Sequence, residues 1–392
     1  TTVDDYAVSV FLSREGYFKK ITPASLRMNA EQKYKEGDAL AQSFETSNAA
    51  EVMFFTDRCQ VYKTRVSEFG DGKASALGDY LPGRLAMDEG ERVIFMVLPG
   101  DYSGCLLFFY ENGKVAKIDT VIDASGYPKP AIFIDVDGDE WEESIDRTET
   151  LVRECNLTSE EIVKKIANAG IVGLGGACFP TQVKLCPPPA FKAECVIINA
   201  VECEPYLTAD HQLMLEHAEE IMVGVSILMK AVKVNKAFIG IENNKPDAIQ
   251  LMTKVASSYA GIEVVPLKVQ YPQGGEKQLI DAVISRQVAA GALPISTGAV
   301  VQNVGTAFAV YQAVQKNKPL FERVITVTGK SLAKPSNFLA RIGTPMKQLI
   351  EACGGLPEDT GKIIGGGPMM GKALVNTDVP TAKGSSGILI MN

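Results

Sequence analysis

The stretch CVIINAVECEPYLTADH, residues Cys195–His211, decides how the centre of this chain is interpreted. It begins as a nearly all-apolar run and then turns polar at Asn199, Glu202 and Glu204. Short continuous apolar runs of this kind are typical of parallel strands buried on both faces of a sheet. Three similar runs follow, namely KAFIGI, IEVVPLKV and GAVVQNV.

Predicted helices lie before and between these strands. SEEIVKKIANAG has a Ser N-cap, an acidic first turn and a closing glycine. Residues 213–232 and 246–259 are predicted to be helical as well. The alternation predicts an open, Rossmann-like α/β sheet that binds its ligand at the carboxyl ends of the strands.

A glycine-rich loop, GIVGLGGACFPTQVKL, follows the first of these helices. Gly173, Gly175 and Gly176 lack Cβ atoms, so backbone N–H groups can approach a phosphate or a flat ring. Lys184 adds a cation for a second phosphate contact. Since the loop follows a helix and not a strand, it is no dinucleotide fingerprint.

Polar patches lie at the ends of three of the predicted strands or in the loops beside them. Besides Asn199, Glu202 and Glu204, these are YPQGGEKQL with Glu276 and VVQNVGTA with Gln302 and Asn303. Together with the glycine loop they make four patches, which favour a cofactor crevice over a set of unrelated loops.

Composition limits the classes of function. The 392 residues include 39 Lys+Arg and 47 Asp+Glu, a net charge of -8, which argues against a dedicated nucleic-acid binder. The eight cysteines form no CxxC pair and the chain has two histidines, so we expect no metal site and no iron–sulfur cluster within these residues. We also expect no signal peptide, no membrane insertion and a cytoplasmic setting.

The first 118 residues contain a repeat of a different kind. VFLSREGYFKKI, MFFTDRCQVYKT and LFFYENGKVAKI each predict a β-hairpin, with turns at Glu15-Gly16 and Asn112-Gly113. Their spacing is typical of blades in a propeller-like array. An array of two blades and one hairpin is expected to be marginally stable alone.

From about Val115 to Asn392 the sequence resembles the C subunit of the Rnf electron-transport complex and, more distantly, the FMN- and NADH-binding flavoprotein subunit of respiratory complex I. The segments that carry the resemblance are the glycine loop, YPQGGEKQLI, EPYLTADH and GGPMMG. The resemblance implies an FMN-dependent, NADH-oxidising module of an Rnf-type NADH:ferredoxin oxidoreductase. It also implies membrane and ferredoxin-like partner subunits that hold the chain on the cytoplasmic face of the membrane.

The resemblance implies cofactor-binding roles for individual residues of this chain. Glu204 and Glu276 are expected to act in catalysis by orienting the nicotinamide nucleotide, and Phe179 is the expected stacking partner of that nucleotide. The residues expected to bind FMN or NADH are Gly173, Gly175, Gly176, Phe179, Lys184, Asn199, Glu202, Tyr271, Gly274, Asn303 and Thr306.

Several positions depart from the complex I pattern. An arginine of that pattern is Leu174 here, a glycine is Cys178, a tryptophan is Leu185 and a glutamate is Gly275. These changes remove charge from the expected pocket, so nucleotide affinity is less secure than flavin binding.

The resemblance also divides the chain. Residues 119–158 form a connecting β segment, 159–321 the α/β FMN- and NADH-binding domain, and 322–392 a soluble-ligand-binding domain of the β-grasp type. In the Rnf subunit a ferredoxin-like domain with two four-iron clusters follows, so iron–sulfur clusters are expected only in that domain, beyond Asn392.

Residues 1–118 resemble part of the C-terminal β-pinwheel of the DNA gyrase A subunit, through SREGYFKKITPASLR and MDEGERVIFM among other segments. The resemblance implies DNA contact by Arg14, Lys19, Lys20, Lys63 and Arg65. Acidic residues outnumber basic ones in this stretch, so DNA affinity is expected to be weak.

Three hypotheses therefore remain: the flavin-dependent NADH oxidation, a gyrase-like DNA-wrapping fragment with a passenger α/β part, and a cobalamin-reductase-like flavoprotein. The two regions of resemblance meet near residues 111–118, where both families have a segment similar to NGKVAKI. We interpret the junction as an apparent fusion of two chains rather than a natural two-function enzyme. The mass of the intact polypeptide tests whether it is one continuous chain.

Overall fold

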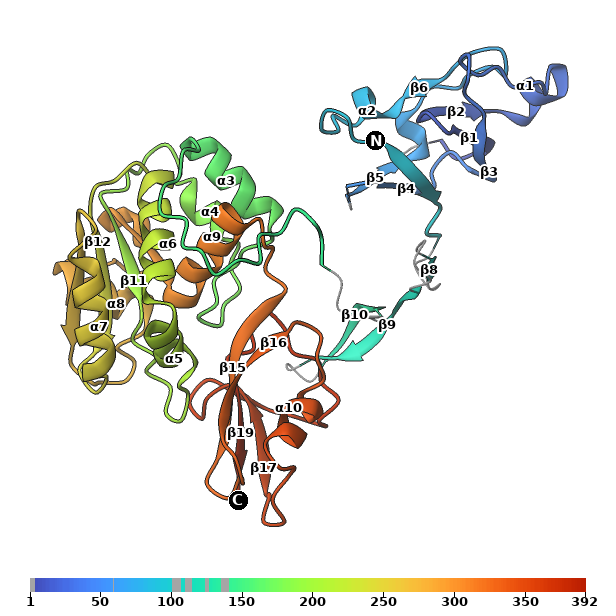
Figure 1. Ribbon diagram of the computed structural model, residues 1–392. Helices are drawn as coiled ribbons and strands as arrows, with labels where there is room; N and C mark the ends of the chain where they lie inside the picture. Colours follow the sequence, from blue (N-terminus) through green and yellow to red (C-terminus); the bar gives the residue numbers. More distant parts are fainter. Residues whose placement is uncertain (1–3, 59, 101–106, 110–114, 124–126, 135–140) are drawn as a thin grey trace. The chain divides into compact units, whose positions relative to one another are not determined.

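The structure is a computed structural model that describes residues 4–58, 60–100, 107–109, 115–123, 127–134 and 141–392 (Figure 1). The chain divides into two compact units. The first comprises residues 1–119 and 132–135, and the second comprises 120–131 and 136–392. A sheet in the order β10-β9-β8 lies where the chain passes from one unit to the other; its strands are β8 (Leu107–Phe109), β9 (Val115–Ile122) and β10 (Pro128–Ile134).

The first unit is built of short antiparallel strands, as the repeats predicted. One sheet has the order β3-β1-β2-β6 and the other β5-β4-β7. The strands are β1 (Ala7–Ser13), β2 (Tyr17–Ile21), β3 (Leu40–Ser47), β4 (Glu51–Thr56), β5 (Val61–Arg65), β6 (Asp79–Tyr80) and β7 (Val93–Val97). Short helical turns are α1 (Pro23–Met28), η1 (Val66–Glu68) and α2 (Leu81–Arg84).

The hairpins predicted for the first two repeats are confirmed as β1–β2 and β4–β5. In the third repeat β8 pairs with β9, while its Asn112-Gly113 turn lies outside the described residues. The buried rings of Phe18, Phe54 and Phe69 form the centre of the first unit, with Phe18 and Phe69 centroids 4.5 Å apart.

The second unit contains the expected parallel sheet, in the order β13-β12-β11-β14. Its strands are β11 (Cys195–Asn199), β12 (Ala237–Glu242), β13 (Ile262–Leu267) and β14 (Ala299–Asn303). The helices are α3 (Ser159–Asn168), α4 (Thr181–Leu185), α5 (Ala209–Glu216), α6 (Ala218–Ala231), α7 (Pro246–Ala256), α8 (Glu276–Ile284), η2 (Pro294–Thr297) and α9 (Val304–Lys316).

Helices cover both faces of this sheet. On one face, Val196 and Ile198 of β11 share a core with α3, α6, α7 and α9, and on the other, Ile197 packs with α8. The approach of α6 to α9 is so close that a Cβ at Gly224 would lie 1.9 Å from the carbonyl oxygen of Ala307. This two-faced burial explains why the four strands are apolar throughout.

Two predicted details are wrong. The helix expected over 213–232 is two helices, because the backbone leaves helical geometry at His217 (φ -128, ψ 34), where α5 ends and α6 begins. The N-cap of α3 is Thr158 and not Ser159. Thr158 and Glu161 form a reciprocal capping box, which satisfies two backbone N–H groups at once.

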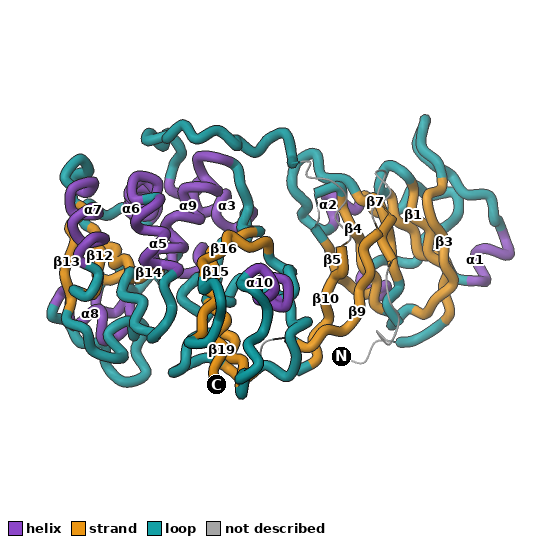
Figure 2. Tube along the Cα trace, turned by 60° about the horizontal axis from the view of Figure 1, so that its bottom comes forward, coloured by secondary structure: helices purple, strands orange, loops and turns teal. Residues whose placement is uncertain are grey.

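A second sheet follows α9, in the order β16-β15-β19-β17-β18. Figure 2 labels its strands β15, β16 and β19. Its strands are β15 (Glu322–Gly329), β16 (Ser336–Arg341), β17 (Lys362–Gly365), β18 (Lys372–Ala373) and β19 (Gly387–Met391). Helix α10 (Met346–Ala352) covers it by packing Met346 and Ile350 against Ile325 and Ile388. No helix of the described residues is long and apolar enough to cross a membrane.

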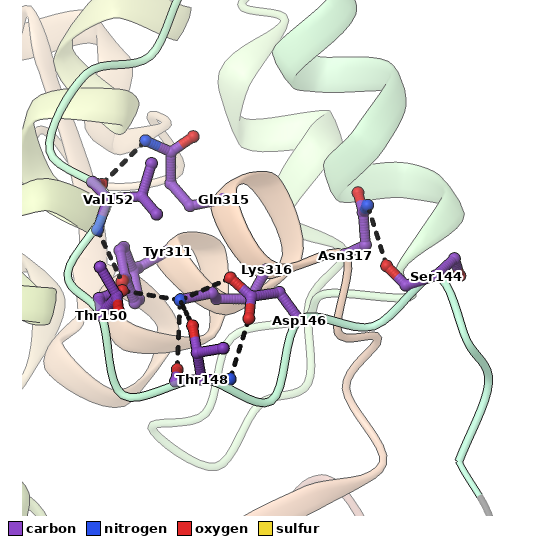
Figure 3. Close-up of polar contacts among 9 residues, drawn as sticks. All are labelled: Ser144, Asp146, Thr148, Thr150, Val152, Tyr311, Gln315, Lys316 and Asn317. Atoms are coloured by element: carbon purple, nitrogen blue, oxygen red, sulfur yellow. Dashed lines mark hydrogen bonds and ion pairs between the residues drawn. The ribbon is translucent and has the colours of Figure 1, made fainter.

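Residues 141–158 run along the α/β domain as a strap that we define by its contacts with α9 (Figure 3). The ammonium of Lys316, at the C-terminus of α9, donates to Asp146 Oδ2 at 2.7 Å, to the Thr150 carbonyl at 2.7 Å and to the Thr148 carbonyl at 3.2 Å. Gln315 donates to the Val152 carbonyl at 2.9 Å. One buried cation therefore holds two backbone carbonyls and a carboxylate of a segment without regular secondary structure.

Trp141, the sole tryptophan of the chain, lies at the start of the strap. Its ring packs edge-on against Phe321, with centroids 5.2 Å apart, and the Arg147 guanidinium lies 4.5 Å from its centroid. Trp141 fluorescence is consequently a local reporter of whether the strap is bound.

We predict that Lys316→Met releases the strap. The carbonyls of Thr148 and Thr150 lose a charged donor, which destabilises the domain by about 2 kcal/mol. Urea unfolding followed by Trp141 fluorescence at pH 7 measures the change. The matched control is Lys233→Met, which removes the exposed Lys233–Glu160 ion pair and is expected to leave the unfolding midpoint unchanged.

The comparison of the wild type with Lys316→Met also gives a pH test. The hydrogen bond from Lys316 lowers the pKa of Asp146 from 3.8 to about 2. A lowered carboxyl pKa contributes stability above its unfolded value, and this contribution is lost as the pH falls through the folded value. The difference between wild type and Lys316→Met should therefore shrink between pH 4 and pH 2; an unchanged difference contradicts the ion pair.

Candidate functional site

A cavity of about 120 Å³ lies at the carboxyl ends of β11 and β14. Six of the residues that the sequence nominated line it: Gly175, Asn199, Glu202, Glu204, Gly274 and Asn303. They come from the glycine loop and three strand-end segments that are far apart in sequence. The fold brings the four polar patches together at one edge of the sheet, where parallel strands place such groups.

The glycine loop is fixed by its own backbone. Gly173 N–H donates to the Phe179 carbonyl at 2.8 Å, and Cys178 N–H donates back to the Gly173 carbonyl at 3.2 Å. At the loop's tip, no described residue accepts a hydrogen bond from the amides of Gly175, Gly176 and Ala177. Successive N–H groups without an internal acceptor form an anion-binding concavity.

Cys178 occupies a position where the complex I pattern has glycine. Its φ is +52, in the left-handed region that glycine enters without the steric cost of a Cβ atom. The loop therefore keeps the glycine conformation although the side chain has changed.

Two asparagines lie at the ends of adjacent strands. Asn303 Oδ1 accepts from the N–H groups of Gly305 and Thr306 and so caps α9, while its Nδ2 donates to Asp210 Oδ2 at 2.8 Å. Asn199 Nδ2 donates to the Gly274 carbonyl at 2.8 Å. Both side chains are held by the protein before any ligand arrives.

Lys184 and Glu276 meet beside a second, larger pocket of about 440 Å³. Lys184 Nζ lies 2.6 Å from Glu276 Oε1 and donates to the Val301 carbonyl at 3.1 Å. The rest of the lining is apolar and includes Phe179, whose side chain is 44% exposed, and Val183. The pocket can accept a flat ring, with one ion pair at its edge.

Glu204 connects the cavity to the C-terminal sheet. Its two carboxylate oxygens accept the N–H groups of Met369 and Met370 at 3.0 and 2.8 Å. A Cβ at Gly367 would lie 2.2 Å from Glu204 Oε2, so this turn needs glycine. The expected catalytic carboxylate thus also anchors the GGPMMG turn.

Other nominated residues lie elsewhere. Thr306 is fully buried, and its hydroxyl accepts from Leu174 N–H at 2.9 Å, so it supports the loop from behind. Tyr271 is 40% exposed and lies outside the lining of both pockets. The structure therefore separates residues that line a pocket from residues that hold its walls.

The predicted DNA contacts need a correction. Lys19 and Lys20 are each 3% exposed, and their ammonium groups bind the Lys33 carbonyl and Asn48 Oδ1 within the first unit. Lys63 pairs with Glu51 at 3.1 Å. Arg14 and Arg65 are exposed. The fold turned the two neighbouring lysines inward, where each is satisfied by protein acceptors.

Sequence reasoning missed the two other charged residues that line the cavity, Asp210 and Arg323. Asp210 stands within the EPYLTADH segment, so its nearness to Glu202 was a usable signal. Arg323 lies near the start of β15, in a segment where the sequence contains no motif. It is 6% exposed and donates to the carbonyls of Leu174 and Lys383.

These carboxylates are electrostatically unusual. Burial, together with the negative charge of Asp210, raises the pKa of Glu202 to about 8. Burial also raises the pKa of Asp210, against the opposing effects of Asn303 and Arg323. Perturbed carboxyl groups in a cavity are typical of functional sites.

The fold and cavity agree with a class of flavin-binding protein. The family model described as "Nuo51 FMN-binding domain" matches residues 166–312, which contain the glycine loop and all four strands of the parallel sheet. The SLBB domain model matches residues 324–373, within the C-terminal sheet.

The chain is also similar to the C subunits of two named complexes. The chain is 49% identical over 289 residues to the C subunit of the proton-translocating ferredoxin:NAD(+) oxidoreductase complex of Clostridium ljungdahlii, covering 72% of this chain and 62% of that protein. It is 46% identical over 281 residues to the C subunit of the Na(+)-translocating ferredoxin:NAD(+) oxidoreductase complex of Acetobacterium woodii, covering 71% and 63%. The chain spans about three fifths of the length of these relatives.

Solved structures support the fold alone. An NAD+-reducing [NiFe]-hydrogenase in the H2-reduced state matches with a TM-score of 0.50 and 20% identity, over 59% of this chain and 46% of that one. The C-terminal domain of DNA topoisomerase IV matches 30% of this chain and 37% of that one at 24% identity, with a TM-score of 0.28, which is too low to carry an argument.

We predict that Glu204→Gln loosens the GGPMMG turn, because an amide has one acceptor oxygen where the carboxylate has two. The N–H groups of Met369 and Met370 should then exchange with deuterium roughly tenfold faster. Hydrogen-exchange mass spectrometry of the peptide spanning 366–371 measures this rate. Glu358→Gln, an exposed glutamate of the same sheet domain, is the matched control; equal exchange in both variants contradicts the anchoring role.

Proposed function

We propose that this chain is the FMN-binding, NADH-oxidising module of an ion-translocating ferredoxin:NAD+ oxidoreductase of the Rnf type. The observation that carries the proposal is the cavity at the strand ends, most of whose lining lies inside the region matched by the FMN-binding family. It lies next to the amides of the glycine loop from which no described residue accepts a hydrogen bond. The names of the relatives give the two partners of the electron transfer, ferredoxin and NAD+.

The residues present fit a phosphate-bearing flavin. The amides of Gly175, Gly176 and Ala177 have no acceptor among the residues that the structure describes, and an ideal Cβ at Gly176 would have nothing within 4 Å there. The side-chain nitrogen of Gln302, at the end of β14, is buried without a partner among the described residues.

When bound, FMN would accept a hydride from NADH and pass electrons on singly. The chain's part is to bind and orient. The loop amides would hold negative charge, while Asn199, Gly274 and Asn303 would fix the polar edge of the ring. Because Lys184 is paired with Glu276, a phosphate or reduced ring that recruits this cation has to compete with that carboxylate.

The apolar 440 Å³ pocket is proposed to take the nicotinamide nucleotide, with Phe179 as its stacking surface and Glu276 at its edge. Glu204 would orient the nucleotide together with the GGPMMG turn that it anchors. Thr306 and Tyr271 would contribute indirectly, through the loop and the flavin-side turn.

The remaining assignments extend this proposal. Residues 1–118 are assigned to the propeller-like part, 119–158 to the connection, 159–321 to the FMN domain, and 322–392 to a β-grasp SLBB domain. Membrane and ferredoxin-like subunits would be the partners, at the cytoplasmic face of the membrane. The iron–sulfur clusters that carry electrons onward would belong to a segment outside residues 1–392 or to a partner.

We predict that the purified full chain binds FMN and that anaerobic NADH bleaches the bound flavin. Gly175→Ala should raise the dissociation constant for FMN about tenfold, about 1.4 kcal/mol, because the new methyl group covers the free amides. The fold should tolerate the change, since the Cβ would lie 3.6 Å from Asn303. Flavin fluorescence quenching measures the affinity.

The matched control is Gly70→Ala in the first unit, whose Cβ would have nothing within 4 Å and which should bind FMN as the wild type does. Binding of a corrin in place of FMN, seen by absorbance, would favour the cobalamin-reductase alternative. Steep, salt-dependent DNA binding without flavin binding would favour the gyrase-like one. Either result rejects the proposal.

A further inference from the structure

Five charged side chains gather on the protein side of the flavin cavity. The carboxylates are Glu202, after β11, Asp210, at the start of α5, and Glu242, at the end of β12. The cations are Lys245, before α7, and Arg323, at the start of β15. Three negative charges thus face two positive ones, and Lys245, Arg323 and Glu242 are less than 8% exposed.

Ion-pair distances and electrostatic effects show how these charges interact. Lys245 Nζ lies 3.6 Å from Glu242 Oε2, and its charge also acts on Glu202 and Asp210. Arg323 acts on Asp210, whose Oδ2 also accepts from Asn303 at 2.8 Å. With Lys245 paired to Glu242 and one Arg323 left for two carboxylates, the cluster carries an excess negative charge.

Glu202 is bound closely to the helix that carries Asp210. Its two oxygens accept the N–H groups of Asp210 and His211 at 2.8 and 3.0 Å. The His211 ring points to a different partner, Asp247, at 2.9 Å, and so brings no proton to the pair. Glu202 itself has a left-handed backbone, φ +48, a conformation that a non-glycine residue adopts at some energetic cost and often at functional sites.

Two interacting carboxylates in one partly buried site do not both ionise readily, since each charge disfavours the other. Burial and the charge of Asp210 raise the pKa of Glu202, and burial raises the pKa of Asp210. One proton on the pair removes the excess charge of the cluster. Both groups also line the cavity with Gly175, Asn199 and Asn303, so the proton lies beside the proposed flavin.

We propose that Glu202 and Asp210 share one proton at neutral pH and deliver it to the flavin when NADH reduces it. This inference rests on the proposed function and deepens it by naming the proton donor. Glu202 and Asp210, in the wall of the cavity, would then supply the flavin with the proton that hydride transfer alone does not bring.

The step balances as follows. The C4–H bond of the dihydronicotinamide breaks, and its hydrogen moves with the electron pair to the flavin N5, which leaves NAD+ and a negatively charged ring. The O–H bond of the carboxyl pair breaks, an N–H bond forms on the ring, and the pair is left doubly ionised. When the flavin is reoxidised its protons leave, and the pair takes one back from solvent.

Redox-difference infrared spectroscopy tests this on the FMN-loaded full chain, reduced photochemically without NADH. The wild type should lose a protonated-carboxyl C=O band on reduction, and the band should shift in D2O. Glu202→Gln and Asp210→Asn should each lack the band. Glu263→Gln, an exposed glutamate on β13, is the control that should keep it.

The outcomes are distinct. A chain that binds no flavin overturns the proposed function. A chain that binds and bleaches flavin without any carboxyl band in the wild type overturns the shared proton alone, and so does a band that survives in both variants. Since the wild-type spectrum is decisive by itself, a variant that fails to fold does not obscure the result.

Discussion

The site depends on the side chain of Asn303. Its oxygen caps α9 by accepting two backbone N–H groups, and its nitrogen binds Asp210 on α5. The same side chain lies beside the glycine loop, where a Cβ on Gly175 would touch it at 3.6 Å. One amide at the end of one strand thereby fixes a helix, a carboxylate and the distance to the loop. Because the amide has one acceptor and one donor end, no carboxylate or aliphatic residue could satisfy both sets of partners.

Left-handed backbone and uncompensated charge occur together at this edge of the sheet. Glu202 and Cys178 both have positive φ values, and the carboxylates outnumber the cations that face them. Elsewhere in the second unit, buried charges are satisfied outright, as Lys316 is by the strap. The excess of carboxylate charge distinguishes this edge from the rest of the second unit, and perturbed carboxyl groups of this kind cluster at functional sites.

The C-terminal sheet belongs to the site as much as the α/β domain does. Arg323 reaches the loop carbonyl of Leu174, and the GGPMMG turn is held by Glu204. Lys383 donates to the Gly170 carbonyl at the start of the loop. The flavin-binding region and the SLBB region therefore share one electrostatic environment, and a change in either is expected to alter both.

The sequence by itself determined the four buried strands, the glycine loop after α3 and the clustering of polar patches at strand ends, because apolar runs and parallel topology leave few other arrangements. It could not show that Lys19 and Lys20 are buried, nor that Thr306 lies behind the loop, since burial depends on which face of each element is covered. The arrival of Arg323 beside Asp210, from another sheet, was decided only by the tertiary structure. Charges separated by more than a hundred residues become neighbours through packing, and no local pattern encodes that distance.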